Sequence, residues 1–188
     1  SGPIRTVLLD SRQPGVIYAG GDQGAWRSAD RGARWVQASG GLPSGIVLDL
    51  AADAVQPGVI YAATAQGPYI SADGRTWAPL TAGLPAEGIF YVAASGQPVA
   101  RLFTSVSDRI YRHDSGQDWQ EISPPLVCDS FPGRTWVLRL AQSPADAGRL
   151  YAGSERGLFV SSDGGATWSC PAPFDVTWVQ VGALVFDP

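Results

Sequence analysis

Short apolar stretches alternate with turns rich in Gly, Pro, Asp and Ser along the whole sequence, and helical periodicity is absent. The first cycle contains four such stretches, each rich in Val, Ile, Leu, Tyr or Trp, at residues 4–10, 16–21, 24–30 and 33–39. Stretches of this length, bounded by turn-forming residues, are typical of short strands. The pattern therefore predicts an all-β protein.

The same cycle returns every 40–50 residues along the chain. The letters GVIYAGG of the first cycle come back as GVIYAAT, ARLFTSV and GRLYAGS. Four strands per unit at this period are typical of propeller blades, which stack around an axis because a lone blade exposes both faces. We expect one domain, a β-propeller of four-stranded antiparallel blades, with repeats at residues 4–45, 46–88, 89–134 and 135–177 and the first strand of a fifth at 178–188.

A Ser-x-Asp-x-Gly-x-Thr-Trp sequence lies between the third and fourth strands of each repeat. It reads SSDGGATW at 161–168, with the variants SADRGARW, SADGRTW and RHDSGQDW earlier in the chain. We expect the Asp carboxylate to accept backbone N–H groups of the turn, Gly to provide positive φ, and Trp to pack between blades. These structural residues are Asp30, Trp35, Asp73, Trp77, Asp114, Trp119, Asp163 and Trp168.

This sequence resembles the Asp box, or BNR repeat, of the sialidase-like β-propeller family. With the flanking YAG and GLP letters, the repeats are similar to those of photosystem II assembly factors, sortilin-type receptors and xyloglucan-degrading hydrolases. The resemblance covers almost the whole chain and implies the propeller fold, but these relatives have unrelated activities. The second box is one residue shorter, and Arg112 and Asp118 replace the usual Ser and Thr in the third.

The residues that a sialidase needs, an Arg triad, a general acid and a Tyr–Glu pair, are not recognisable in the sequence. The chain has only three Glu, and Tyr18, Tyr61 and Tyr151 recur with the repeat, which favours a structural role. No residue is therefore predicted to be catalytic. The sequence favours a non-enzymatic protein without settling the matter.

A polysaccharide hydrolase needs two carboxylates on opposite sides of a cleft. Asp10, Asp53 and Asp187 end the first strand of three units, and their recurrence favours turn capping. The single histidine, His113, lies within the third box, where a solvent-facing turn residue is expected.

The net charge is −4, and all 13 basic residues are Arg. This balance argues against nucleic acid and anionic membrane surfaces as partners. No apolar run reaches the roughly 18 residues of a membrane span, so membrane insertion is not expected. The boxed carboxylates are too dispersed for a calcium loop, so no metal or cofactor is expected. Cys128 and Cys170, on adjacent blades, are predicted to form a disulfide, which places the protein in a secreted, periplasmic or cell-surface setting.

The turns between strands two and three differ from unit to unit, whereas the box turns are uniform. Variation over a constant framework is typical of a recognition surface. The candidate binding residues on this rim are Asp22, Gln23, Gln66, Asp108, Arg109, Glu155 and Arg156. The long linker at 123–135 is expected on the same rim. Trp136 and Trp178 open the first strands of their units, where core packing is favoured and an aromatic ligand surface is the alternative.

The sequence as a whole favours a non-catalytic extracytoplasmic scaffold that binds or assembles a protein or glycan partner. The alternative is a part of a polysaccharide-active glycoside hydrolase, xyloglucanase-like or sialidase-like. Residues 181–188 repeat the pattern of a first strand, but each of the four units already has a first strand of its own, so a ring of four units has no open position for them. We therefore predict an arc of a larger ring, completed either by further chain or by a second copy in a homodimer of about eight blades.

Overall fold

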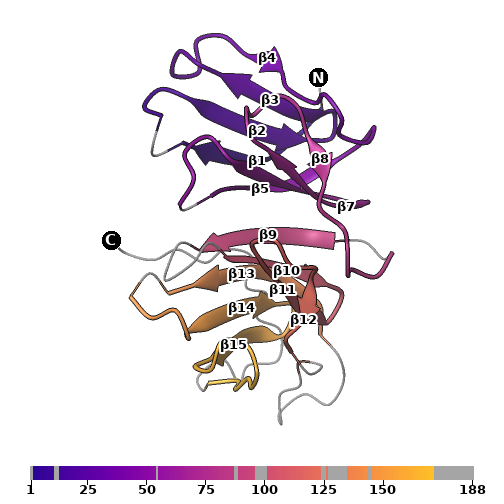
Figure 1. Cartoon of the computed structure of the whole chain (residues 1–188), viewed down its shortest axis with the longest axis vertical. Coiled ribbons are helices and arrows are strands. Elements are labelled where there is room, and N and C mark those ends of the chain that lie inside the picture. Colours follow the sequence, from indigo (N-terminus) through magenta and orange to yellow (C-terminus); the bar gives the residue numbers. More distant parts are fainter. Residues whose placement is uncertain are drawn as a thin grey trace.

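The computed structural model describes residues 2–10, 13–53, 55–86, 89–95, 101–123, 126, 135–143 and 145–171. These residues form antiparallel sheets joined by turns, as the alternation of short apolar stretches and turn residues predicts (Figure 1). Within the described ranges, no helix is long and apolar enough to cross a membrane.

Each sheet consists of strands that follow one another in the chain and pair with their sequence neighbours. We call the sheets blades 1 to 4. Blade 1 contains β1 (Ile4–Leu9), β2 (Ile17–Gly21), β3 (Gly24–Ser28) and β4 (Val36–Gln37). Blade 2 contains β5 (Val47–Ala52), β6 (Ile60–Thr64), β7 (Gly67–Ser71) and β8 (Ala78–Pro79). Blade 3 contains β9 (Ile89–Ser95), β10 (Arg101–Val106), β11 (Arg109–Asp114) and β12 (Gln120–Glu121).

Blade 4 contains β13 (Val137–Gln142), β14 (Leu150–Ser154) and β15 (Gly157–Ser161) in its described part. An isolated bridge between Val160 and Ser169 occupies the place of a fourth strand. The strand predicted at residues 178–188 lies outside the described residues, as does Trp178. The repeat boundaries therefore stay a prediction.

The predicted fourth strand of blade 1, residues 33–39, is longer than the observed strand. Only Val36 and Gln37 form the strand that pairs with β3, and Trp35 lies just before it. The backbone N–H of Arg34 is bonded to the Asp30 carboxylate, so the box turn extends further than the pattern of apolar residues indicates.

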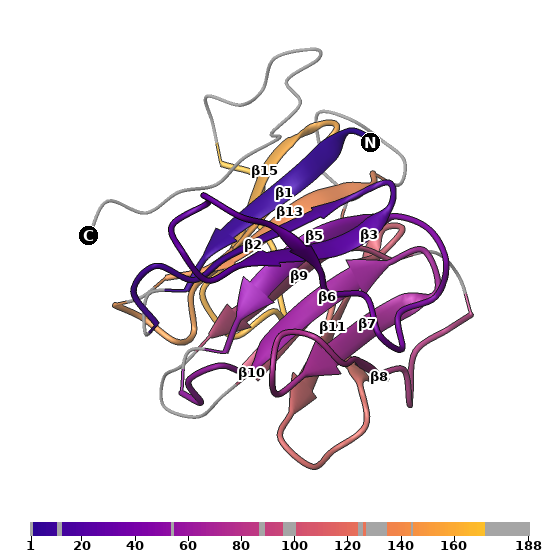
Figure 2. The same ribbon diagram turned by 90° about the horizontal axis from the view of Figure 1, so that it is seen from above.

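The first strands of the four blades, β1, β5, β9 and β13, lie side by side in chain order, and blades 1 and 4 lie at opposite ends of the molecule (Figures 1 and 2). The core is divided among the junctions between consecutive blades. One apolar cluster joins blades 1 and 2 around Tyr18, Leu50 and Trp77. A second joins blades 2 and 3 around Tyr61 and Trp119, and a third joins blades 3 and 4.

Candidate functional site

In the box turns of blades 1, 2 and 4 the Asp carboxylate accepts two recurring kinds of hydrogen bond, one from the Ser hydroxyl and one from a backbone N–H later in the turn. In blade 4 the Ser161 hydroxyl donates to Oδ1 of Asp163, which also accepts the backbone N–H of Thr167, and the Gly165 N–H donates to Ser161 Oγ. Blades 1 and 2 repeat the Ser-to-Asp bond at 2.8 Å and 3.0 Å. The carboxylate is thus used by its own turn, which leaves it little capacity for a ligand.

These hydrogen bonds favour the ionised form of the box carboxylates. The pKa of Asp73 is held well below its usual value, chiefly by the backbone N–H and the hydroxyl of Thr76. The pKa of Asp163 is lowered to about 2, chiefly by the hydroxyl and N–H of Thr167. Asp73 and Asp163 are therefore ionised caps rather than proton donors at neutral pH.

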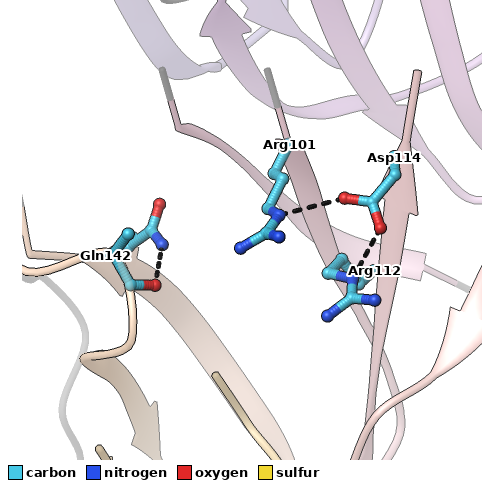
Figure 3. Close-up of polar contacts among 5 residues, drawn as sticks. Arg101, Arg112, Asp114 and Gln142 are labelled. Carbon is cyan, nitrogen blue, oxygen red and sulfur yellow. Dashed lines mark hydrogen bonds and ion pairs between the residues drawn. The ribbon is translucent and has the colours of Figure 1, made fainter. Parts of the chain in front are cut away.

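The third box departs from this geometry, as its sequence does. Oδ1 of Asp114 lies 3.0 Å from Nε of Arg101, and Oδ2 lies 3.0 Å from Nε of Arg112 (Figure 3). The carboxylate therefore bridges two arginines, one of which stands where the other boxes have Ser.

The histidine in this box does not face solvent from a turn, as the sequence reading expected. His113 lies in strand β11, is half-buried, and packs its ring 5.3 Å from the ring of Trp119. Burial lowers its pKa, so the imidazole is held away from its charged form. The expectation failed because β11 continues to Asp114, through the start of the box.

The box tryptophans connect neighbouring blades. Nε1 of Trp77 in blade 2 donates to the carbonyl of Ala38 in blade 1 at 2.7 Å, and Nε1 of Trp119 in blade 3 donates to Leu80 in blade 2 at 2.8 Å. Trp168 instead donates to Gly165 of its own turn.

The carboxylates that end the first strands are turn caps, which confirms their interpretation from sequence. Asp10 accepts the backbone N–H of Gln13, and Asp53 accepts those of Val55 and Gln56. Asp53 also accepts the Tyr61 hydroxyl at 2.6 Å, and burial together with this carboxylate raises the pKa of Tyr61 well above its usual value. Asp187 lies outside the described residues.

The topology separates two rims. The first, which we call the box rim, carries the box turns and the turns between strands one and two, joined for example by the Arg31 N–H to the Gly15 carbonyl. The second, which we call the variable rim, carries the turns between strands two and three. It also carries the starts of the first strands β1, β5, β9 and β13, which we call the inner strands, and there the Asp22 N–H donates to the Pro3 carbonyl.

The seven candidate residues are all at turns or strand starts of the variable rim, but they differ in accessibility. Gln23, Gln66, Glu155 and Arg156 are exposed. Asp22 is paired with Nε of Arg5 at 2.6 Å.

The two candidates in blade 3 are less free to reach a partner. Asp108 is buried, and Arg109 forms an ion pair with Glu121 of β12. The candidates that remain accessible to a partner are therefore the four exposed residues Gln23, Gln66, Glu155 and Arg156.

Trp136 is not a core residue, in contrast to the favoured expectation. Its side chain is 48% exposed, and its carbonyl accepts the Glu155 N–H on the variable rim. The register explains the error: Val137 pairs with Ser154 as Val47 pairs with Thr64, so Val137 takes the buried position. An exposed Trp beside Glu155 fits the alternative, an aromatic ligand surface.

Sequence reasoning missed a polar set on the inner strands. Each inner strand has a register irregularity near its start, and the residue immediately after it occupies one equivalent place in all four blades. Bulges of this kind redirect side chains and are common beside functional sites. The four residues, which we call the axial set, are Thr6, Asp49, Tyr91 and Arg139.

The axial set is linked across blades. The Thr6 hydroxyl donates to Oδ1 of Asp49 at 3.2 Å, and Oδ2 of Asp49 lies 3.4 Å from the backbone N of Val92. Cζ of Arg139 lies 3.8 Å from the centre of the Tyr91 ring. No pattern of period two or period forty marks these residues, because their types differ from blade to blade.

Burial raises the pKa of Asp49, although the positive charge of Arg139 and the hydrogen bonds from Leu50, Val92 and Thr6 act in the opposite direction. Asp49 thus differs from Asp30, Asp73 and Asp163 of the box turns, whose pKa values are lowered. Burial of this kind disfavours the charged form of a carboxyl group.

The described residues contain no free cysteine, and they provide no metal site. The described residues contain no group of three or more His, Cys, Asp or Glu side chains that could hold a metal ion. Cys170 packs against the junction of blades 3 and 4. Its predicted partner Cys128 lies outside the described residues, as does most of the linker, so the pairing stays a prediction.

The fold is similar to known propeller structures. The GH74 xyloglucanase from Xanthomonas campestris matches 92% of this chain with a TM-score of 0.71 and 22% sequence identity. The structure of YCF48 bound to D1 peptide matches 93% of this chain with a TM-score of 0.65 and 20% identity. The extracellular domain of BT4673 from B. thetaiotaomicron matches 84% of this chain with a TM-score of 0.64 and 20% identity. This chain spans only 30%, 55% and 20% of those chains, respectively.

These likenesses establish a class of protein, the β-propeller, built here from antiparallel sheets of up to four strands. They assign no activity, since one of these structures is an enzyme and another is a peptide complex. No family model matches the chain, and no curated protein matches it. The similar structures include an extracellular domain.

Proposed function

We propose that the chain is a non-catalytic, extracytoplasmic binding scaffold of the Asp-box type, which recognises a protein or glycan partner through the variable rim. The observation that carries the proposal is the contrast between the two rims. Box carboxylates are consumed by their own turns, whereas Gln23, Gln66, Glu155 and Arg156 are exposed at different turns of a common framework.

The same side-chain hydrogen bonds hold the variable-rim turns of blades 2 and 4. Thr64 in blade 2 and Ser154 in blade 4 each donate a hydroxyl bond to the carbonyl of the glycine three residues later. The same oxygens accept the N–H of Gln66 and Arg156. A turn held in this way presents its tip side chains with little loss of conformational freedom on binding, which favours affinity.

The chemistry of this rim is mixed. Glu155 and Arg156 provide both signs of charge, Gln66 provides an amide, and Trp136 provides an exposed aromatic ring. A ligand that combines hydrogen-bonding groups with an apolar face, such as a peptide segment or a sugar ring, fits such a surface.

The second candidate function is a part of a polysaccharide hydrolase, and Asp49 is the observation that favours it. A glycosidase needs one carboxyl group with a raised pKa and a second carboxylate across the bond to be broken. Asp49 has a raised pKa, and Asp22 lies at the same end of the inner strands.

Binding and turnover separate the two functions. The protein would be screened on glycan and peptide arrays, with xyloglucan oligosaccharides as one defined probe, and reducing ends would be counted in parallel. We expect binding without turnover, and we expect the double variant Gln66→Ala/Arg156→Ala to weaken it at least tenfold. The matched control, Gln117→Ala/Arg75→Ala, changes the same residue types on the box rim, where both side chains are exposed.

Two results would count against the scaffold. Equal loss of binding in both double variants would remove the variable rim as the site. Release of reducing ends that disappears in Asp49→Asn or Asp22→Asn would establish the hydrolase instead.

A further inference from the structure

On the box rim, the junction of blades 1 and 2 is closed by the backbone. The Gly40 N–H donates to the Arg75 carbonyl at 3.1 Å, and the Trp77 N–H donates to the Gly40 carbonyl at 2.7 Å. Gly40 and Thr76 thereby form a parallel bridge between the segment after β4 and the second box. A Cβ at Gly40 would lie 3.3 Å from the Arg75 carbonyl oxygen, so the close approach favours glycine in this place.

The junction of blades 2 and 3 keeps only one of these two bonds. The Trp119 N–H donates to the Ala82 carbonyl at 2.9 Å, so Ala82 takes the place of Gly40. Within the described part of the chain, the Ala82 N–H does not donate to the Gln117 carbonyl, and the parallel bridge is absent. A pocket of about 240 Å³ lies here between the segment after β8 and the third box. The junction that carries alanine in place of glycine is thus open.

The register of β11 supplies a histidine to this pocket. Strands β3, β7 and β15 each end at the box serine, and the box aspartate follows two residues later in the turn. In blade 3 the strand continues to Asp114, which pairs with Arg101, and His113 pairs with Leu102. Successive residues of a strand point to opposite faces. Asp114 therefore lies with Arg101 and Arg112 on one face (Figure 3). His113 lies on the other face and lines the pocket.

The third box also places an acidic side chain in the pocket. In blades 2 and 4 the residues before the box tryptophan, Thr76 and Thr167, donate their N–H and hydroxyl groups to the box aspartate. Asp118 stands in their place in the third box and lines the pocket. Its side chain is exposed, and it forms no hydrogen bond or ion pair with any other residue that the structure describes. The carboxylate is thus available to a ligand.

The chemistry of the pocket suits a cationic group. Among the described residues that line it, Asp118 is the one charged side chain. Burial lowers the pKa of His113, so at neutral pH its ring is uncharged and keeps a nitrogen lone pair that accepts a hydrogen bond. Pro79 and Leu80 provide an apolar wall. A long basic side chain combines an apolar stem with charged hydrogen-bond donors, which complements these three features.

We propose that the box rim carries a second binding site, in which this pocket takes one Arg or Lys side chain of a protein partner. Asp118 forms the ion pair with the cationic head, and His113 accepts one of its hydrogen bonds. The volume lies below the roughly 300–1,000 Å³ of pockets for drug-sized ligands, which fits a single side chain. The site is separate from the variable rim, so its test is independent of the proposed function.

The test uses His113 as its own reporter, because it is the one histidine of the 188-residue chain. The blocked tripeptide Gly-Arg-Gly is titrated into tag-free protein while the imidazole Hε1 resonance is followed by NMR. The Lys peptide is a second arm, and the peptide with citrulline, the uncharged isostere of arginine, is the ligand control. We expect a saturable shift with the Arg and Lys peptides, at least threefold weaker binding of the citrulline peptide, and weaker binding of both cations as salt screens the ion pair.

Two matched variants locate the site. Asp118→Asn should weaken binding of the Arg peptide at least threefold, because it removes the ion-pair partner. Asp146→Asn makes the same change at an exposed aspartate of another box-rim turn and should leave the affinity unchanged. Because Asp118 is exposed, its variant should keep the wild-type denaturant midpoint. A His113 resonance that does not move, equal binding of the citrulline and Arg peptides, or equal losses in the two variants would each overturn the proposed site.

Discussion

Nε1 of Trp77 donates a hydrogen bond of 2.7 Å to the carbonyl of Ala38, which lies 39 residues earlier in the chain. Trp119 makes the same bond to Leu80, again over 39 residues. The box therefore contributes to two blades. Its Asp accepts hydrogen bonds within a turn of its own blade, and its Trp donates a hydrogen bond to the outer edge of the preceding blade. This double role explains why a short polar sequence ends in the largest side chain.

Truncation of a box tryptophan should be costly where its ring is buried against the preceding blade, as in Trp77. We expect Trp77→Ala to lower the free energy of unfolding by about 3–5 kcal/mol, as for other large buried aromatic side chains. Trp35→Ala should cost less than about 1 kcal/mol, because Trp35 is partly exposed. Chemical denaturation measures both. Equal losses at the two positions would mean that the junction is not the source of the stability.

The box carboxylates should stabilise the protein only while they are ionised. Asp73 has a folded-state pKa below its unfolded value, so its contribution is present above the unfolded pKa near 3.8 and is lost as the pH falls through the folded pKa. We expect Asp73→Asn to cost about 1 kcal/mol at pH 7, since solvent screens this exposed group. The cost should shrink toward zero in acid. A cost that is the same at pH 7 and pH 2 in denaturation curves would contradict a charge-dependent cap.

Asp49 should show the opposite dependence on pH. Its folded-state pKa is raised, so its contribution is fully present below the unfolded pKa near 3.8 and is lost as the pH rises through the folded pKa. Relative to wild type, the Asp49→Asn variant should therefore become more stable on going from pH 3 to pH 7. Thermal unfolding of both proteins over this range is the measurement, and Asp73→Asn serves as the control with the reverse trend.

The predicted Cys128–Cys170 disulfide would close a loop of about forty residues. In the chain-entropy account, such a cross-link stabilises the fold by roughly 4 kcal/mol. We expect the non-reduced protein to contain no free thiol by mass spectrometry, and we expect reduction to lower the denaturant midpoint. Two alkylatable thiols in unreduced protein would refute the pairing.

The sequence predicted most of the architecture because each blade is encoded locally. Val, Ile and Tyr alternate within short runs, and each turn provides its own caps, as Asp10 and Asp53 do. Strand ends were predicted less well where side chains bond the backbone. The box turn shortens β4 in this way, and β11 runs on to Asp114.

The candidate site was less accessible to sequence reasoning because exposure depends on neighbouring blades. Trp136 was assigned to the core on its position in the repeat, but the shift of one residue in register turns it to the surface. The axial set escaped notice because Asp49 and Arg139 occupy equivalent places without sharing a residue type. Only their register in space relates them.

The most direct test of the repeated blade junction is the exchange of the indole N–H hydrogens, followed by NMR in the wild-type protein. The account predicts slow exchange for Trp77 and Trp119, whose indoles are bonded to the preceding blade, and faster exchange for Trp35, whose side chain is 40% exposed. Fast exchange of Trp77 and Trp119 would contradict the junction.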